Sequence, residues 1–256
     1  MRYVRDATGR FRDRPYYELR ELDTECETLV GDFLRKRHGR VDYPFSTDDL
    51  TVLLESMVLD LDLFADLSKE GENVEGVTYF QASGKPKVAI AAVLSEEQWR
   101  ENRLRTTLSH ELSHVKFHGF VWALEIEEAA QAESVGRRRS GWYDRDDTVR
   151  PLASAAVDVR GAAKCKRENI LGPTNQIDWM EWQAGYGCGA ILIPRTELEY
   201  VLRRVKADPS PLPTSPEGAQ RIAAIQGAFA VSADAARVRL LQTGYLSQPG
   251  GVPSGI

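Results

Sequence analysis

The sequence is poor in cysteine and has no long apolar run. Its 256 residues include three cysteines, Cys26, Cys165 and Cys188, an odd number at wide spacing. Such a set does not form a disulfide framework and is typical of a reducing compartment, so we expect a cytoplasmic protein. No segment approaches the roughly 18 apolar residues of a membrane span, and the polar, basic N-terminus lacks the apolar core of a secretory signal.

An excess of positive charge is also missing. The chain has 33 lysines and arginines against 38 acidic residues, a formal net charge of −5. This balance excludes a protein built to wrap nucleic acid non-specifically. Hydrophobic residues make up 42% of the chain, which is ordinary for a globular protein, and 256 residues are enough for one domain with a sizeable core or for a domain with a small appendage.

The first part of the chain predicts a mixture of helices and strands. Residues 1–14 are expected to form a disordered leader. Apolar residues at steps of three and four predict a helix over 16–37, and Ser46 or Thr47 caps a second helix that ends near Ser56. Alternating or β-branched segments at 59–63, 76–81 and 87–93 predict a sheet of about three strands, and Ser95 begins a capping-box pattern that opens the next helical stretch.

The second part is predicted to be helical with irregular interruptions. Residues 119–177 are interpreted as an insertion, in which the polar segment 135–160 is expected to be irregular. A helix is predicted over 178–193 and ends at Pro194. A proline-rich linker over 207–216, a helical pair within 217–246 and a disordered tail over 247–256 complete the chain. The expected fold class is therefore α+β, mainly helical, with one domain over 15–206 and a C-terminal helical segment.

Three of the four histidines fall on one predicted helix. His110, His114 and His118 follow one another at steps of four, which places side chains on one helical face. Two imidazoles at this spacing can bind one zinc ion, and a glutamate next to the first, Glu111, lies close enough to act as a base. The alternative is a helix with exposed polar residues, but apolar residues on the same helix predict that it is partly buried.

A catalytic zinc site needs a third protein ligand. His110 and His118 are separated by eight residues, roughly 12 Å along a helix axis, so His118 is expected to support a ligand instead of binding the metal. A carboxylate is the remaining choice, and five glutamates qualify: Glu125, Glu127, Glu128, Glu133 and Glu181. The first four belong to an acidic stretch typical of a solvated face. Glu181 stands among aromatic and small residues, where an unpaired charge would be costly and a metal would offset that cost.

The sequence resembles the ImmA/IrrE family of metallo-endopeptidases, which have a zincin-like fold, in three segments. These are residues 107–118 around the paired histidines, 181–194 ending in Ile-Leu-Ile-Pro, and 229–246 near the C-terminus. The resemblance implies one Zn²⁺ per chain, His110, His114 and Glu181 as its ligands, and Glu111 as the catalytic base. Family members often serve mobile elements or stress responses, and some cleave a helix-turn-helix repressor. The resemblance therefore implies a protein substrate, such as a repressor of that kind, and a role in regulating transcription.

The chain departs from the family pattern in two places. The gap between His114 and Glu181 is long, which is the reason for the insertion over 119–177. Gly185 and Gly187 stand where the family has Asn and Phe. These departures affect the shape of the substrate pocket more than the metal site.

Several residues outside the motif carry further hypotheses. Tyr186 and Tyr79 are candidates to stabilise the oxyanion of an attacked carbonyl, although tyrosines more often serve packing. Cys165 and Cys188 could bind metal or sense redox state, but lone cysteines are more often inert.

The C-terminal helical pair allows a different class of function. It carries Arg221, Arg237 and Arg239 and could be a helix-turn-helix, which would make the protein a DNA-binding regulator. We favour a helical cap on the core, and expect neither direct nucleic-acid binding nor a membrane partner. A metal-dependent sensor that binds a partner without cutting it is the third alternative, and Glu111 argues against it.

Overall fold

The computed structural model of the chain describes residues 1–81, 84–140, 162–166, 178–203 and 210–248, with the backbone alone for 129–140. Helices dominate, and the strands form two small sheets, so the α+β class is confirmed. The expected tail over 247–256 lies outside the described residues from 249 onward, as does the start of the expected linker, 204–209. No helix among the described residues is long and apolar enough to cross a membrane.

Two N-terminal helices agree with their sequence signals. α1 (Leu19–His38) buries one apolar stripe and ends at Gly39, whose φ of 73° is the left-handed conformation that glycine favours. α2 (Thr47–Met57) begins at Ser46, whose side chain accepts a hydrogen bond from the Asp49 backbone N–H. Capping chemistry and helical periodicity were therefore sufficient to predict both helices.

The main sheet has four strands instead of about three. β3 (Asp60–Ala65), β4 (Val74–Tyr79), β5 (Lys87–Ala91) and β6 (Ala162–Lys166) lie in the order β3-β5-β4-β6. β3 pairs with β5 in parallel, whereas β4 pairs antiparallel with both β5 and β6. The extra strand comes from the expected insertion. β5, which lies within 87–93, is paired with β3 on one side and with β4 on the other, so it offers no free edge to an extended substrate.

The N-terminal leader is a hairpin and not a disordered segment. β1 (Arg2–Arg5) pairs antiparallel with β2 (Asp13–Tyr16). Asp6 closes the loop between them by accepting backbone hydrogen bonds from Thr8 and Phe11. Phe11 is buried against Trp122 and Trp179, and this packing holds a strongly charged segment that composition alone indicated to be unfolded.

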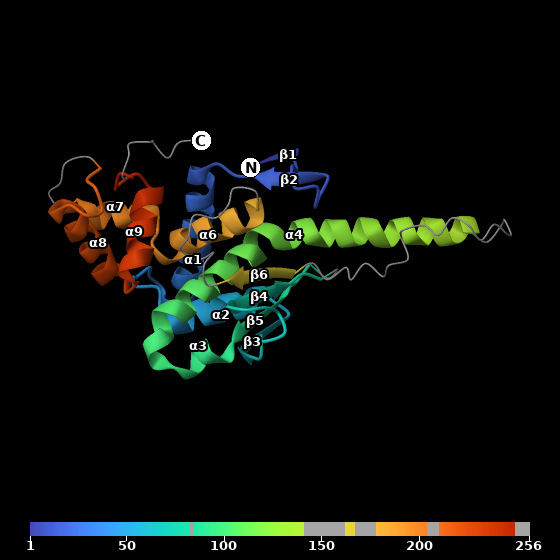
Figure 1. Cartoon of the computed structure of the whole chain (residues 1–256), viewed down its shortest axis with the longest axis horizontal. Coiled ribbons are helices and arrows are strands. Elements are labelled where there is room, and N and C mark those ends of the chain that lie inside the picture. Colours follow the sequence, from blue (N-terminus) through green and yellow to red (C-terminus); the bar gives the residue numbers. More distant parts are fainter. Residues whose placement is uncertain (82–83, 141–161, 167–177, 204–209, 249–256) are drawn as a thin grey trace.

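The metal-motif helix is much longer than its motif. α3 (Ala92–Glu96) and the 3₁₀ turn η1 (Gln98–Arg100) precede α4 (Glu101–Ser140). Ser95 lies inside α3 and donates to the Leu63 carbonyl, so it does not cap a helix as expected. α4 extends well beyond the rest of the molecule in Figure 1, and residues 135–140, expected to be irregular, are its last turns.

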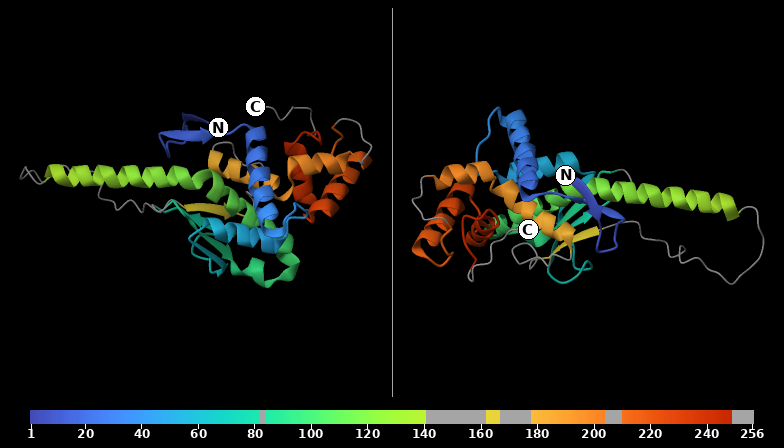
Figure 2. Two further views of the ribbon diagram at one scale, coloured as in Figure 1. Left: turned by 180° about the vertical axis from the view of Figure 1, so that it is seen from behind. Right: turned by 90° about the horizontal axis from the view of Figure 1, so that it is seen from above.

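The C-terminal half packs on α4 and α1. Asp178 caps α6 (Trp179–Leu192), and Pro194 separates it from α7 (Arg195–Leu202), which was not expected. α8 (Pro216–Phe229) and α9 (Ala233–Gln242) form the predicted helical pair. One hydrophobic core joins residues of α1, α4, α6, α8 and α9. In Figures 1 and 2 the four-stranded sheet lies on one side of α4, while α6 and α1 lie on the other.

Candidate metal centre

The side chains of three residues that can bind a metal converge between α4 and α6. His110 and His114, one turn apart on α4, bring their Nε2 atoms within 3.1 Å of each other. Glu181, in the first turn of α6, places Oε2 3.3 Å from Nε2 of His110 and Oε1 3.3 Å from Nε2 of His114. These three residues can hold a metal ion, and both histidines are fully buried.

The spacing of the ligand atoms is compatible with one bound metal ion. Ligands about 2.0 Å from a tetrahedral centre lie about 3.3 Å apart; the two Nε2 atoms are 3.1 Å apart, and each lies 3.3 Å from a different oxygen of Glu181. Glu181 Oε2 is also buried without a hydrogen-bond partner among the described residues. A metal ion would provide the partner that this oxygen lacks, so the residues fit the expected group.

Close approach of the two helices sets this geometry. Glycine at 187 lets α6 lie directly on α4, because a Cβ atom there would stand 2.7 Å from Ser113 Oγ and 3.3 Å from Phe117. Gly187 is the position at which the resemblance led us to expect phenylalanine. The small residue therefore permits the helix contact that brings Glu181 to the two histidines.

Glu111 lies between the metal ligands and the sheet. Thr78 of β4 donates a hydrogen bond of 2.5 Å to Glu111 Oε2, while Oε1 has no hydrogen-bond partner among the described residues. Gly76, two residues earlier on the same face of β4, leaves room for this carboxylate, since a Cβ atom there would collide with Oε1. The unpartnered oxygen is the one available to a reacting proton. Gly76 and Thr78 are two residues apart in a predicted strand, so the sequence indicated that they share one face of it. It did not indicate that this face lies against α4 and Glu111.

His118 contacts His114 and is not part of the group of residues that could hold a metal ion. Its Nδ1 lies 2.9 Å from Nδ1 of His114, and its Nε2 lies 3.1 Å from Oε1 of Gln183, whose amide donates to the Pro15 carbonyl. One assignment of protons satisfies both contacts. Nδ1–H of His114 donates to Nδ1 of His118, and Nε2–H of His118 donates to Oε1 of Gln183. This assignment leaves the Nε2 lone pair of His114 free for a metal, as a histidine ligand requires. No local pattern in the sequence indicated Gln183, which was not among the expected site residues.

Burial and the charges of neighbouring groups shift the pKa values of Glu181, His114 and Glu111. Burial opposes the charged form of Glu181, but the adjacent His114 and His110 outweigh it and hold its pKa well below its ordinary value. Burial likewise disfavours protonated His114, yet Glu181 beside it raises the His114 pKa. For Glu111, burial dominates and raises the pKa. A carboxylate with a raised pKa is a stronger base than an ordinary carboxylate, which suits a group that accepts a proton.

The other expected site residues lie elsewhere. Tyr186 donates to Asp23 at 3.0 Å on the side of α6 that faces α1, and Tyr79 donates to Glu70 at 2.9 Å on the outer face of the sheet. Neither hydroxyl is directed at the metal ligands, so the oxyanion assignments are wrong. Glu125, Glu127 and Glu128 are not part of the metal group, and the side chain of Glu133 is outside the described residues.

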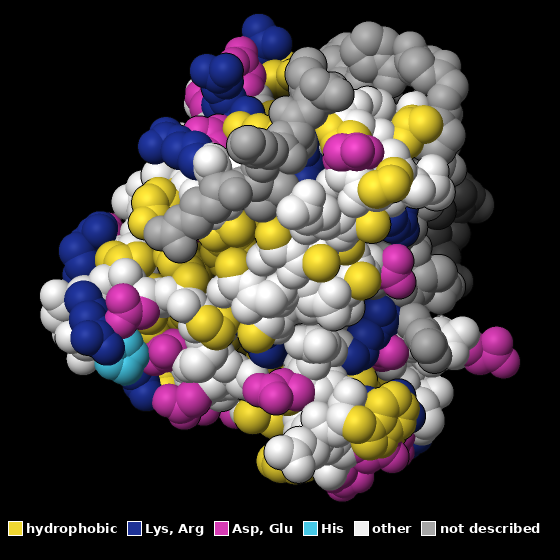
Figure 3. Space-filling model, turned by 90° about the vertical axis from the view of Figure 1, so that its left-hand side faces the viewer, with side chains coloured by type: hydrophobic (Ala, Val, Ile, Leu, Met, Phe, Trp, Pro, Cys, Tyr) yellow, Lys and Arg dark blue, Asp and Glu magenta, His cyan; other side chains and the backbone are white. Residues whose placement is uncertain are grey.

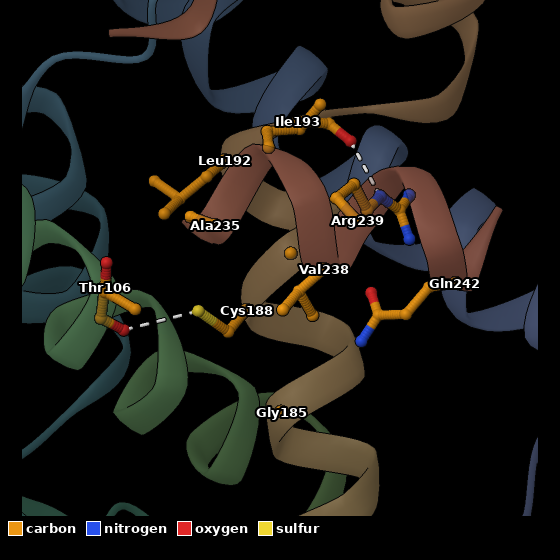
Figure 4. A pocket seen from close by; sticks show the side chains of 10 residues that line it. Thr106, Gly185, Cys188, Leu192, Ile193, Ala235, Val238, Arg239 and Gln242 are labelled. Atoms are coloured by element: carbon orange, nitrogen blue, oxygen red, sulfur yellow. Dashed lines mark hydrogen bonds between the residues drawn. The ribbon is translucent and has the colours of Figure 1, made fainter. Parts of the chain in front are cut away.

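The cysteines are free and buried. Cys188 lies 3.0 Å from Ser109 Oγ and directs its sulfur toward the Thr106 carbonyl, in a small cavity between α6 and α9 that Figure 4 shows. Burial raises its pKa to about 11, which disfavours the thiolate that a metal or an oxidant requires. Cys165 lies on β6 and is fully buried. Neither cysteine joins the three metal-binding residues.

No protein-family model matches the sequence, and no curated protein matches it. The assignment of a function therefore depends on the site itself.

Proposed function

We propose that this chain is a zinc-dependent endopeptidase that cuts a protein substrate. The observation that carries the proposal is the convergence of His110, His114 and Glu181 beside a buried glutamate, Glu111, with one unpartnered oxygen. Two histidines and a carboxylate are the ligand set of a catalytic zinc site, which keeps one position open. The resemblance to the ImmA/IrrE family supports the same metal, the same reaction and a regulatory protein, such as a helix-turn-helix repressor, as substrate.

The chain's own residues have distinct parts in the reaction. A bound zinc ion would supply a Lewis acid that polarises the peptide carbonyl and makes water a better nucleophile. Glu111 accepts the proton of the attacking water and delivers it to the amine that leaves. Thr78 fixes one oxygen of Glu111 and so directs the other oxygen into the site. His118 and Gln183 hold His114 in the ring orientation and tautomer that ligation requires.

Exchange of Glu111 for glutamine tests this proposal. Glu111→Gln keeps the shape and the hydrogen bond from Thr78, so the variant should fold and bind zinc as the parent does. It should cleave at least about 100-fold more slowly, because general acid–base catalysis contributes that much or more. The measurement is cleavage of an unfolded protein such as reduced casein, or of a helix-turn-helix repressor encoded next to this chain. Equal rates for the variant and the parent would refute the mechanism.

A DNA-binding regulator with a structural or sensory metal site is the competing function. Arg221 and Arg239 speak against it, since both are buried and donate to main-chain carbonyls. Arg237 is the exposed arginine of the three and pairs with Asp234. On the face shown in Figure 3, basic side chains are interspersed with acidic ones. We therefore expect no sequence-specific duplex binding at physiological salt, and a footprint with steep salt dependence would favour the regulator.

A further inference from the structure

β6 is an edge strand of the sheet, next to the strand β4 that contacts the candidate metal centre through Thr78. It pairs antiparallel with β4, whose opposite edge is taken by β5. In Figures 1 and 2, β6 runs between β4 and α6, the two elements that contribute Thr78 and Glu181 to the site. An extended peptide that approached the metal by adding a strand to β4 would need the place that β6 holds.

The inner face of β6 lies beside the catalytic glutamate. Cys165 is opposite Gly76 in the ladder, and Ala163 is opposite Thr78. Paired residues on neighbouring strands point to the same side of a sheet, so both small side chains face the side on which Glu111 lies. Cys165 is fully buried, and Ala163 is 8% exposed and packs near Trp179.

The outer face of β6 contributes little packing. Ala162, Lys164 and Lys166 are exposed, and Lys164 pairs with Glu70 at 3.0 Å. The strand is therefore held by its main-chain ladder and by two small inward side chains. Domains that bind peptides by strand addition use the same means: main-chain hydrogen bonds give affinity, and alternate side chains give specificity.

The candidate metal centre is buried, so the position of β6 beside it matters for the access of a substrate. His110, Glu111 and His114 are fully buried, and the side chain of Glu181 is 13% exposed. β6 is a strand that borders this buried centre, because it pairs with β4 beside Thr78, the residue that contacts Glu111. Either β6 is a permanent strand of the fold, or it leaves when a substrate binds.

We propose that the strand position beside β4 is a peptide-binding site, that β6 is its resident ligand, and that substrates enter by exchanging with β6. This inference rests on the proposed peptidase function. The ligand class is an extended, unfolded segment with small side chains at two positions two residues apart, as Ala163 and Cys165 are. Small side chains suit these positions because the inward face of β6 is buried. The free protein is therefore latent, and its apparent affinity for a peptide is reduced by the fraction of molecules in which β6 has left.

A peptide-binding measurement on the full chain tests the exchange without requiring catalysis. The probe is a fluorescein-labelled peptide with the sequence of residues 161–167, with serine in place of its cysteine. All chains carry Glu111→Gln so that no cleavage occurs. Ala163→Asp places an unpaired carboxylate at the buried face of β6 and should release the strand, whereas Ala162→Asp adds the same charge on the exposed face. Fluorescence anisotropy should show at least about tenfold tighter binding for Ala163→Asp than for the parent or for Ala162→Asp.

The outcomes separate this inference from the proposed function. Equal peptide affinities in the folded parent, Ala163→Asp and Ala162→Asp would show that β6 is a permanent strand, even if the parent cleaves proteins. Tighter binding by Ala163→Asp, with no zinc-dependent cleavage once Glu111 is restored, would support the exchange and refute the peptidase. Should Ala163→Asp fail to fold, Lys164→Glu removes the pair with Glu70 from the exposed side. In that variant, faster alkylation of Cys165, followed by peptide mapping, should report release, and an unchanged rate would refute it.

Discussion

Gly76 leaves the space that the Glu111 carboxylate occupies, and no sequence motif indicated this role. A Cβ atom at this position would overlap Glu111 Oε1 and stand 2.9 Å from Thr107 Cγ2. Gly76→Ala should therefore displace the base while the three metal ligands stay in place. Displacing a catalytic group by about 1 Å can reduce the rate about 100-fold. We expect a loss of cleavage of this size with an unchanged zinc content, measured by steady-state kinetics and by metal analysis.

Gly227 in α8 is the matched control for this exchange. A Cβ atom there meets nothing within 4 Å, so Gly227→Ala should keep full activity. It should also raise the free energy of unfolding by about 0.5–1 kcal/mol, because alanine favours a helix interior more than glycine does. A similar loss of activity in both variants would mean that the space beside Glu111 has no special role.

Site residues whose positions follow from helical spacing were predicted from the sequence. Site residues that depend on tertiary contacts were missed. The separation of His110 and His114 places both imidazoles on one face of any helix. Glu181 could be chosen because a carboxylate in apolar surroundings needs a partner. Thr78 and Gln183 could not be found in this way, since their contacts depend on how β4 and α6 cross α4.

Among the elements, α9 is fastened to the core by a buried ion pair. Arg239 donates to Asp23 of α1 at 2.5 Å and to the Ile193 carbonyl at 3.0 Å, and it is fully buried. Arg239→Met should lower the free energy of unfolding by about 3 kcal/mol or more, because it leaves the Asp23 carboxylate buried without its main partner. Denaturation in urea measures this loss.

Arg237 provides the comparison on the same helix. Its side chain is 40% exposed and pairs with Asp234 at 3.4 Å, so Arg237→Met should change stability by no more than about 0.5 kcal/mol. Equal effects of the two substitutions would mean that α9 is not anchored through Asp23. A cap fastened in this way does not present Arg239 to a DNA groove.

The elements also differ in how well the sequence predicted them. α6 and α9 begin at side-chain caps, Asp178 and Ser232, so local signals predicted their first turns. β6 has no such signal: its lysines and alanines are weak strand formers, and its partner β4 precedes it by more than 80 residues. The N-terminal hairpin was missed for a related reason, because it depends on the packing of Phe11 against Trp122 and Trp179. Segments that depend on distant partners cannot be predicted from local pattern alone.

For the whole molecule, the metal site joins halves of the chain that are far apart in sequence. His110 and His114 lie on α4 and Glu181 lies on α6, so an ion bound by all three stabilises the folded state selectively. A ligand present at 1,000 times its Kd adds about 4 kcal/mol of stability. For a chain of this size, we expect zinc to raise Tm by roughly 8–16 °C over the chelator-treated protein.

Ligand variants check the origin of this shift in Tm. The double variant His110→Ala/His114→Ala should show no response to zinc, and Glu181→Gln should need a much higher zinc concentration. Glu125→Gln, which changes a carboxylate on α4 outside the metal group, should respond as the parent does. Calorimetry at several zinc concentrations measures all four proteins. A full response by the double variant would contradict the metal site.

The complete burial of His110 and His114 governs when an ion can be acquired. An ion in bulk water has no direct path to imidazoles that are 0% exposed, so loading and loss must wait for a local opening of the fold. The lifetime of a bound ion is then set by the opening rate of the protein, not by the strength of three coordinate bonds. Such a chain would gain or lose its ion slowly compared with an exposed site. Its metal content would therefore follow a change in metal supply only after a delay set by the opening of the fold.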